Sequence, residues 1–335
     1  MDLPFVTLDV FTNTLHRGNP LAVVMVPESL RSRVTQKMKQ NVAKDFNASE
    51  TVFLSEPFRS EGNDDDAREI DIFMIDREIP FAGHLTIGTA VLLRYFYSSI
   101  AREPSWSATG GLDIRKINTK AGPIDIHTAP NHGIRAKIPH NVHLHAKTLA
   151  DAIGPAAQAE IERLGLSTNA DIRAAELGAP VFSIVNGMTF LLIQLPSLEL
   201  LRLVPVSKMG LDGLRGSLLD EGWRESYIGR LYYVDVDGDG DGDARSGAQD
   251  VRHIRMRMIE FGNEDPATGS AASALAAYLT LAEKKGRKFR MTQGVEMGRE
   301  STIEVETTIE QDGSRLGELW LGGTAVVATK GSTRV

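Results

Sequence analysis

Two short segments of the chain combine a proton-handling side chain with a glycine and a hydroxyl residue. They are residues 83–90, GHLTIGTA, and residues 264–271, EDPATGSA, and both lead into apolar, helix-competent sequence. An ungapped comparison sets His84 against Asp265, Gly88 against Gly269 and Thr89 against Ser270. Helix N-termini present free amides and a positive dipole end, which bind carboxylates. The pattern therefore predicts two helix N-termini facing one another across a cleft, although two ordinary glycine-containing helix starts would show the same letters.

Glu50 is the acidic side chain best placed to exchange a proton. It follows a polar loop and opens an apolar strand at Thr51–Leu54. Desolvation at the mouth of a buried strand raises the pKa of a carboxyl group, and a pKa near neutrality suits a group that takes and returns a proton. The alternative is an exposed acid at a strand end, which the residue pattern by itself favours.

His84 and Asp265 each have a structural alternative. His84 stands between Gly83 and an apolar run, where it could be a ligand, an acid or base, or a helix-start imidazole that hydrogen-bonds to backbone. Asp265 precedes Pro266, which favours an extended or capping conformation. A capping carboxylate at a cleft can also bind an ammonium or hydroxyl group, so both roles of Asp265 are compatible.

Two further patterns favour structural roles over binding sites. The segment at 83–89 lacks the lysine of a phosphate loop, because Gly88 is followed directly by Thr89, so no nucleotide site is expected. The histidines at 140, 143 and 145 have no carboxylate or cysteine nearby in the sequence to complete a metal set. We therefore expect a solvated segment there and no metal site.

The composition narrows the class of protein. The chain has 335 residues, a formal net charge of −7 and no cysteine. An acidic chain offers no strong basic field, so nucleic-acid binding is not expected, and this length suggests two domains. The lack of cysteine excludes disulfides, zinc–thiolate sites and racemases that use a cysteine pair. Neither a secretory signal nor an apolar run approaching the ~20 residues of a membrane helix is visible, so we expect a cytoplasmic protein without membrane contact.

Short strands and two glycine-entered helices recur along the chain. The first half predicts strands at 6–10, 21–26, 50–54, 70–75, 112–117 and 124–127 and helices at 28–46 and 86–97. The second half predicts helices at 146–164, near 207–223 and at 267–284, with strands at 181–185, 189–194, 231–236, 251–259, 302–307, 317–321 and 324–329. One principal helix among strands in each half predicts two α+β domains of similar plan rather than a strictly alternating Rossmann fold.

Several further motifs follow one another in a specific order. They are Asp9–Thr12 (DVFT), Gly18–Val24 (GNPLAVV), Ser49–Phe53 (SETVF), Pro80–His84 (PFAGH), Gln293-Gly294 with Gly298-Arg299, and Gly322-Gly323. With them the chain resembles, nearly end to end, the PhzF-like phenazine-biosynthesis family of isomerases, which share the diaminopimelate-epimerase fold. The resemblance implies an α+β protein of two similar domains, each a mostly closed β-sheet around a central helix.

The resemblance also implies roles for individual residues. Glu50 would be the acid/base, and His84 and Asp265, also catalytic, would hold the substrate from either side. The substrate-binding residues would be Ser49, Gly83, Gly269 and Ser270. Of these, Ser270 and the amides near Gly269 would bind the substrate carboxylate. Members of the family are mostly cofactor-free and often dimeric, so the resemblance implies no cofactor and a homodimer.

The chain departs from the family pattern at several places, among them an altered approach to the second motif at 258–263. Leu85 stands where a proline usually follows the Gly-His pair, Asp71 where an arginine is usual, and Met74-Ile75 where a Thr-Pro is usual. The residues of the acid/base apparatus are present, so proton transfer is expected. The identity of the substrate stays open.

We expect a first domain over residues 1–128, completed by the last strand at 322–335, and a second over 129–321, with the active site in the cleft between them.

The leading function is cofactor-independent isomerisation or epimerisation of a small carboxylate-bearing metabolite, in which Glu50 moves the proton and helix N-termini stabilise the carboxylate or enolate charge. The type activity of the family is isomerisation of a dihydro-hydroxyanthranilate. The alternatives are a dehydratase that uses the same base and a catalytically idle small-molecule binding protein.

An acidic segment matches only part of a calcium-binding loop. Asp235–Gly240 (DVDGDG) fits the first six positions of an EF-hand loop, but the twelfth position, which needs a bidentate glutamate, is Ser246. We predict that the acidic loop at 237–247 is an insertion that binds no calcium. Calorimetric titration of the protein with calcium chloride should show no micromolar binding. A micromolar site that disappears in Asp237→Ala would contradict this.

Overall fold

The computed structural model describes residues 1–335 except 57–65, 98–112, 155–157, 237–250 and 261. The chain forms two compact units, one of Met1–Ile138 with Leu321–Val335 and one of Pro139–Trp320. The first unit thus runs past the boundary expected after residue 128, because strand β8 (Gly133–Lys137) pairs with the strand before it. The acidic loop at 237–247 lies outside the described residues. Asp235, just before it, is ion-paired with Arg252.

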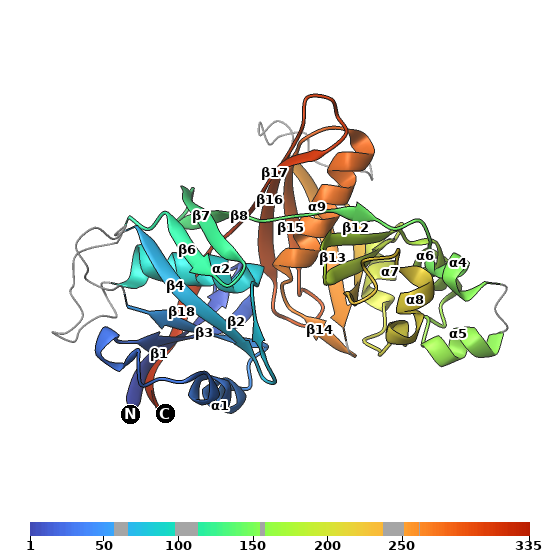
Figure 1. Ribbon diagram of the computed structural model, residues 1–335. Helices are drawn as coiled ribbons and strands as arrows, with labels where there is room; N and C mark the ends of the chain where they lie inside the picture. The colour runs from blue at the N-terminus through green and yellow to red at the C-terminus, as the bar shows by residue number, and fades with distance from the viewer. Residues whose placement is uncertain (57–65, 98–112, 155–157, 237–250, 261) are drawn as a thin grey trace. The chain divides into compact units, whose positions relative to one another are not determined.

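The first unit is a mixed sheet that curls around one helix. Its helical elements are η1 (Glu28–Leu30), α1 (Gln36–Phe46), α2 (Gly83–Val91) and the π-helical η2 (Leu92–Phe96). Its strands are β1 (Asp2–Val10), β2 (Asn19–Val26), β3 (Glu50–Ser55), β4 (Ala67–Met74), β5 (Glu78–Ile79), β6 (Lys116–Thr119), β7 (Gly122–Ala129), β8 and β18 (Ala325–Arg334). They pair in the order β18–β1–β2–β3–β4–β6–β7–β8, with β5 added to β4. Helix α2 contacts β18 and β8, at the two ends of this order, as well as β1 to β3, so the sheet mostly closes around it (Figure 1).

The composition of α2 explains its central place. All nine of its residues are buried and none carries a permanent charge, as a helix enclosed on every side requires. Gly88 allows the closest approach to the sheet. A Cβ at this position would lie 2.5 Å from Leu21 Cδ2 and 2.7 Å from Val10 Cγ2. A larger residue at position 88 would therefore push α2 away from β1 and β2.

Helix α1 covers the other face of this sheet and delivers the chain to β3. Phe53 of β3 packs with Val42 of α1 in a core on that face. Because successive side chains of a strand point to opposite faces, Glu50 lies on the face towards α2. Helix α1 ends at Asn47, which adopts the left-handed conformation with φ 49° and closes the last turn onto Ala43 O. This tight end turns the chain directly into Ser49 and Glu50.

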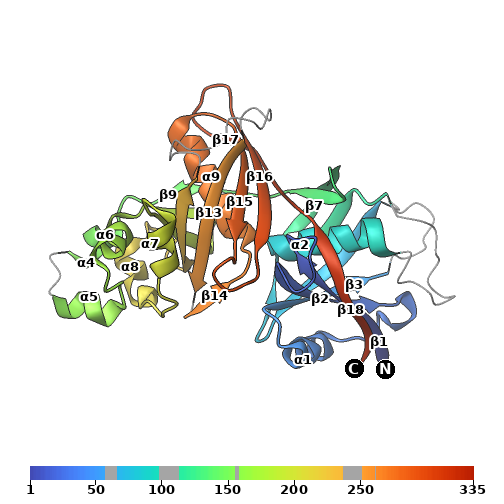
Figure 2. The ribbon, with the colours of Figure 1, turned by 180° about the vertical axis from the view of Figure 1, so that it is seen from behind.

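The second unit is built in the same way around α9 (Gly269–Glu283), which is drawn in orange in Figure 2. Its other helical elements are α4 (Leu149–Ile153), α5 (Gln158–Leu164), α6 (Ala170–Gly178), α7 (Leu198–Leu203), η3 (Leu211–Leu214) and α8 (Arg215–Leu218). Its strands are β9 (His143–Leu144), β10 (Val181–Val185), β11 (Met188–Gln194), β12 (Tyr227–Asp235), β13 (Val251–Glu260), β14 (Asn263–Asp265), β15 (Lys288–Gln293), β16 (Ser301–Ile309) and β17 (Leu316–Gly323), whose last residues belong to the first unit. The pairing order is β9–β10–β11–β12–β13–β15–β16, with β14 added to β13. Helix α9 contacts β10, β11 and β16, so this sheet also wraps its helix.

The two units repeat one chain path. In each, an antiparallel hairpin leads through helical segments to a parallel strand, β2 to β3 and β11 to β12. A second parallel step then runs from β4 to β6 through β5 and α2, and from β13 to β15 through β14 and α9. Each central helix is therefore the crossover of a parallel pair. This confirms the predicted fold class, an α+β protein of two similar domains with a mostly closed sheet around a central helix.

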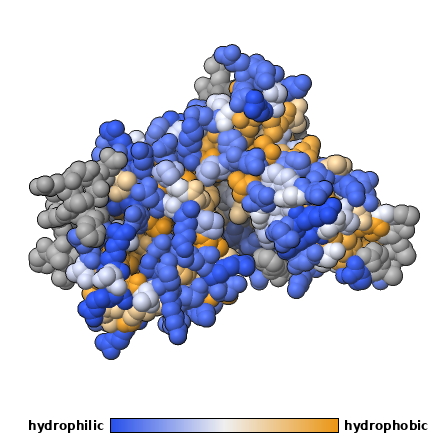
Figure 3. All heavy atoms as spheres, in the orientation of Figure 1, coloured by the Kyte–Doolittle hydropathy of each residue, from blue (hydrophilic) through white to orange (hydrophobic). Residues whose placement is uncertain are grey.

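The two ends of the chain meet in the first unit. Strands β1 and β18 pair along their lengths, and the Met1 amine donates to Val335 O at 2.8 Å, so the termini lie side by side in Figures 1 and 2. Hydrophilic side chains predominate on the face drawn in Figure 3. Within the described ranges, no helix combines the length and the apolar character needed to span a bilayer.

Candidate functional site

In the first unit, the structure places Glu50 against His84. Glu50 is the first residue of β3, and His84 is the second residue of α2. Glu50 Oε2 and His84 Nε2 are 3.6 Å apart, and the two side chains are 16% and 8% exposed. The burial of Glu50 contradicts the alternative of an exposed acid at a strand end. Two of the three residues predicted to be catalytic thus lie side by side.

The surroundings of Glu50 favour its protonated form. Burial raises the pKa of its carboxyl group above the usual value, and a hydrogen bond from the Ser49 side chain opposes this effect in part. Glu50 Oε2 is buried and accepts no hydrogen bond from the residues that the structure describes. A carboxyl group with a raised pKa and an open oxygen can both take up and release a proton.

In the second unit, a short segment joins Asp265 to α9. Side-chain hydrogen bonds hold both ends of this segment. Asp265 ends β14, and the Thr268 hydroxyl donates a hydrogen bond to its Oδ2. The side chain of Gln293, fully buried at the end of β15, holds both ends of the segment. Its Oε1 accepts from the Thr268 amide at 2.9 Å, and its Nε2 donates to Asp265 O at 2.7 Å and to Thr268 Oγ1 at 3.1 Å.

The first turn of α9 has no side-chain cap. Gly269 is buried and Ser270 is half-buried as its second residue. No side chain in the described ranges accepts from the amides of Gly269, Ser270 or Ala271, and the N-cap Thr268 makes no capping bond. Gly83 likewise opens α2 behind Ala82, which has no capping group. Neither helix start is closed by a capping side chain, and each has the positive dipole end that favours anions.

The two helix starts do not correspond in the register of the ungapped sequence comparison. Helix α2 begins at Gly83, earlier than the expected Thr86, so Gly88 and Thr89 lie inside the helix and pack against the sheet. In both units a proline follows the short strand, Pro80 after β5 and Pro266 after β14, and holds the preceding residue extended. The structure equates Gly83 with Gly269, His84 with Ser270, and Ile79 with Asp265. His84 therefore corresponds to the proposed carboxylate ligand rather than to Asp265.

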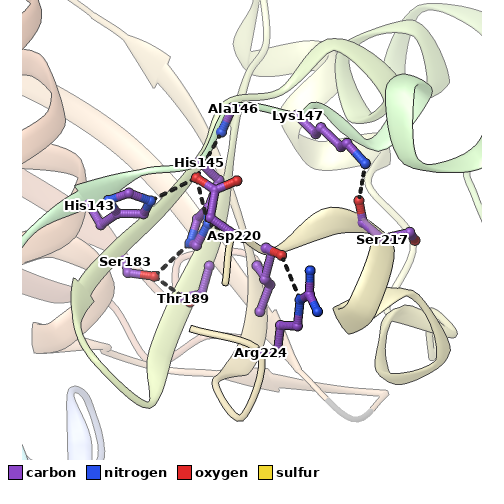
Figure 4. Close-up of polar contacts among 10 residues, drawn as sticks. His143, His145, Ala146, Lys147, Ser183, Thr189, Ser217, Asp220 and Arg224 are labelled. Atoms are coloured by element: carbon purple, nitrogen blue, oxygen red, sulfur yellow. Dashed lines mark hydrogen bonds and ion pairs between the residues drawn. The ribbon is translucent and has the colours of Figure 1, made fainter. Parts of the chain in front are cut away.

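A third polar cluster lies in the second unit, at residues expected to form a solvated segment. His145 is instead buried, and Asp220 completes the cluster from far along the chain (Figure 4). His143 Nε2 is 2.8 Å from Asp220 Oδ2, and the Asp220 amide donates to His145 Nδ1 at 3.1 Å. His145 Nε2 lies 2.9 Å from Ser183 Oγ. No signal in the sequence around the histidines could have found Asp220.

The hydrogen bonds of this cluster argue for a structural role rather than a metal site. The ligand atoms of His143, His145 and Asp220 lie within 4.8 Å of one another, as a metal set would require. However, His145 Nδ1 accepts from an amide, so Nε2 of the neutral ring carries the proton and donates to Ser183. Burial and the neighbouring His143 lower the pKa of His145 to about 4, which keeps this ring neutral. Only His143 and Asp220 have lone pairs left, too few for a structural zinc site.

Sequence reasoning missed two residues that contact the predicted site. Thr268 and Gln293 both bind the segment that carries Asp265. A weak signal for Thr268 is its type, because threonine directly before a helix is a typical N-cap. Gln293 opens one of the motifs quoted for the family resemblance, but no local rule assigns it a bonding partner.

The raised pKa of Glu50 predicts a pH-dependent cost in stability. Its folded-state pKa lies above the ordinary value of 4.5, so the wild type loses stability as the pH rises from about 4.5 through the folded-state pKa. Glu50→Gln should therefore be more stable than wild type at pH 8, by about 1–3 kcal/mol, and the difference should shrink towards pH 4. Urea unfolding at both pH values measures this. The control Glu221→Gln, at an exposed position, should show no such trend. A Glu50→Gln variant less stable than wild type at pH 8 would contradict the burial argument.

Comparison with known proteins identifies relatives along the whole chain. The family model PhzC-PhzF, described as phenazine biosynthesis-like protein, matches residues 8–198 and 242–331. An uncharacterized isomerase of Mesorhizobium japonicum is 29% identical over 337 residues, which cover 98% of this chain and 97% of that protein. The trans-2,3-dihydro-3-hydroxyanthranilate isomerase of Pseudomonas aeruginosa is 38% identical over 89 residues, which cover 27% of this chain and 29% of that enzyme.

Solved structures show the same fold. The crystal structure of a PhzF-family phenazine biosynthesis protein of Bacillus anthracis aligns with a TM-score of 0.68 and 20% identity, covering 100% of both chains. A probable proline racemase of Agrobacterium radiobacter aligns with a TM-score of 0.57 and 14% identity, covering 99% of this chain and 92% of the racemase. Because the family model matches most of the sequence and the fold agrees, the chain belongs to the PhzC-PhzF family of phenazine biosynthesis-like proteins.

Proposed function

We propose that this protein is an isomerase or epimerase that moves a proton between carbon atoms of a small metabolite bearing a carboxylate. The observation that carries the proposal is the largely buried carboxyl group of Glu50, which has a raised pKa and an open, buried oxygen beside His84. Two relatives of this chain are named as isomerases, which supports the same class of reaction.

In the proposed reaction Glu50 acts as both base and acid. As a carboxylate it takes a proton from one carbon of the substrate, and the electron pair left behind delocalises into a neighbouring double bond or carboxyl group. The protonated Glu50 then gives the proton to another carbon, or to the other face of the same carbon, so atoms and charge balance without a cofactor. Burial makes the carboxylate a stronger base than one in water, because desolvation disfavours its charged form. His84, beside Oε2, is placed to hydrogen-bond the substrate there.

The start of α9 supplies the proposed carboxylate site. The uncapped amides of Gly269 and Ser270, together with the Ser270 hydroxyl, offer donors to a carboxylate at the positive end of the helix dipole. Donors fixed in advance stabilise the negative charge that develops as the proton leaves carbon. Asp265, held by Thr268, would accept a hydrogen bond from an ammonium or hydroxyl group of the substrate.

The first substrate to test is trans-2,3-dihydro-3-hydroxyanthranilate, because the Pseudomonas aeruginosa relative is named for it. It carries the carboxylate, amino and hydroxyl groups that the proposed site would bind. Amino acids and hydroxy acids come next, since Leu85 and Met74 differ from the residues usual in the family.

Glu50→Gln should keep ligand binding but lose turnover by about 10²- to 10⁴-fold, the usual contribution of an acid/base group. The assay incubates each candidate substrate in D₂O and follows deuterium at carbon by mass spectrometry and product structure by NMR. If the proton is transferred within the substrate without exchange with solvent, no deuterium is incorporated, but NMR still detects the rearranged product. A variant with a near wild-type rate would refute Glu50 as the base. A ligand that binds but neither gains label nor rearranges would favour the binding-protein alternative.

Ser270→Ala should lower kcat/KM by about 5- to 100-fold, because it removes a hydrogen bond to a charged carboxylate. The matched control is Ser273→Ala, which changes a buried serine one turn further along α9 and should leave kcat/KM unchanged. A crystal structure with the substrate carboxylate bound away from the first turn of α9 would overturn the assignment.

A further inference from the structure

Thr268 occupies the N-cap position of α9 but does not cap the helix. Its side chain accepts no hydrogen bond from the first-turn amides, and its hydroxyl donates to Asp265 Oδ2 instead. We propose that Thr268 is a positioning residue diverted from capping, which aims the Asp265 carboxylate and leaves the first amides of α9 open to the substrate carboxylate. The proposal rests on the function proposed above and adds a residue to it.

The other helices of the chain show what such a residue ordinarily does. Where the N-cap is described and carries a serine, threonine or asparagine, the side chain accepts from an amide of the first turn in every helix except α9. These capping residues are Thr35 of α1, Thr148 of α4, Asn169 of α6 and Ser197 of α7. The exception is therefore the helix that carries the proposed carboxylate site. A capping bond at that end would occupy an amide that the carboxylate requires.

Gln293 helps to direct the Thr268 hydroxyl towards Asp265. Its Nε2 donates to Thr268 Oγ1, and its Oε1 accepts from the Thr268 amide. With a donor on one side of Oγ1 and Asp265 on the other, the hydroxyl hydrogen points at the carboxylate. The result is a directed chain of hydrogen bonds from Gln293 through Thr268 to Asp265.

The backbone between Asp265 and Thr268 is also held, so the hydroxyl direction does not drift. Pro266 O accepts from Ser301 Oγ at 3.0 Å. Gly294, with φ +75°, lies so close that a Cβ there would be 2.7 Å from Pro266 O. Buried groups of β15, of β16 and of the turn between these strands therefore hold the backbone between Asp265 and Thr268 in place.

Turnover tests the positioning of Asp265. With trans-2,3-dihydro-3-hydroxyanthranilate, Thr268→Val should lower kcat/KM by about 10- to 100-fold, and Thr268→Ser, which keeps the hydroxyl, should restore it. The control Thr280→Val makes the same change on the same helix, where a buried hydroxyl bonds to Thr307 Oγ1 at 2.6 Å. It should lose stability but not kcat/KM. A loss no larger in Thr268→Val than in Thr280→Val would overturn the proposal.

Anion binding tests the diverted cap without relying on turnover. Benzoate serves as a carboxylate probe, followed through the backbone amide NMR signals of Gly269 and Ser270. Asp265→Ala removes a negative charge, which by itself would strengthen anion binding. We expect the released Thr268 hydroxyl to cap α9, so that Asp265→Ala binds benzoate about 2- to 30-fold more weakly than Asp265→Ala/Thr268→Val.

The two experiments separate the possible failures. If the single variant binds benzoate as tightly as the double variant, or if no variant shows a benzoate-dependent shift at these amides, the diverted cap is refuted. If benzoate behaves as expected but wild type does not convert the dihydro-hydroxyanthranilate, the substrate of the proposed function is wrong and the role of Thr268 at the amides stands.

Discussion

The enclosure of a helix by a curled sheet is the constraint on which the rest of this structure depends. A helix buried on every side cannot carry charged side chains. Helix α2 and the buried part of α9 are accordingly built mainly from small and apolar residues, and the charged Glu283 stands at the exposed end of α9. Side chains that can carry a charge then gather where the chain enters the helix, after the short strands β5 and β14. The first-turn amides, which no intrahelical bond can satisfy, come at that same point. The fold thus places unsatisfied donors and polar side chains together at the start of the helix.

Burial of a carboxyl group is not in itself a sign of function in this protein. Glu176 is fully buried and its pKa is raised by burial, as for Glu50. However, both oxygens of Glu176 have partners, since Oε1 accepts from Tyr232 OH at 2.7 Å and Oε2 from the Ser167 amide at 2.8 Å. Glu50 Oε2 accepts no such bond within the described ranges. A fully bonded acid stabilises a loop, whereas an acid with an open oxygen is available for proton exchange.

The repeated chain path carries different chemistry in its two copies. In the structural register the second helical residue is His84 in one unit and Ser270 in the other, and Ile79 corresponds to Asp265. The two units share the residues that shape the backbone at this point, namely a proline after the short strand and a glycine at the helix start. The side chains around these shared parts are free to differ, so one half holds the buried acid and the other the braced carboxylate. The two similar backbones therefore carry different polar groups.

Local structure was predictable from the sequence where local rules decide it. The hairpin at 181–194 follows from Asn186-Gly187, where Gly187 has φ +97°, and the helix expected at 267–284 is α9 at Gly269–Glu283. The prediction of one continuous helix over 146–164 was wrong, because α4 ends at Gly154, which has φ +69°.

The relations between distant segments were decided by the tertiary structure. Tertiary contacts bring Gln293 to Thr268 and Asp220 to His143, and the element order corrects the register in which the two helix starts correspond. By itself the sequence determined the fold class, the central helices and the candidate residues, because periodicity, turn chemistry and ordered motifs are local properties of the chain. The burial of Glu50, its approach to His84 and the diversion of Thr268 depend on which strands lie side by side, and a long-range contact of that kind leaves no local pattern.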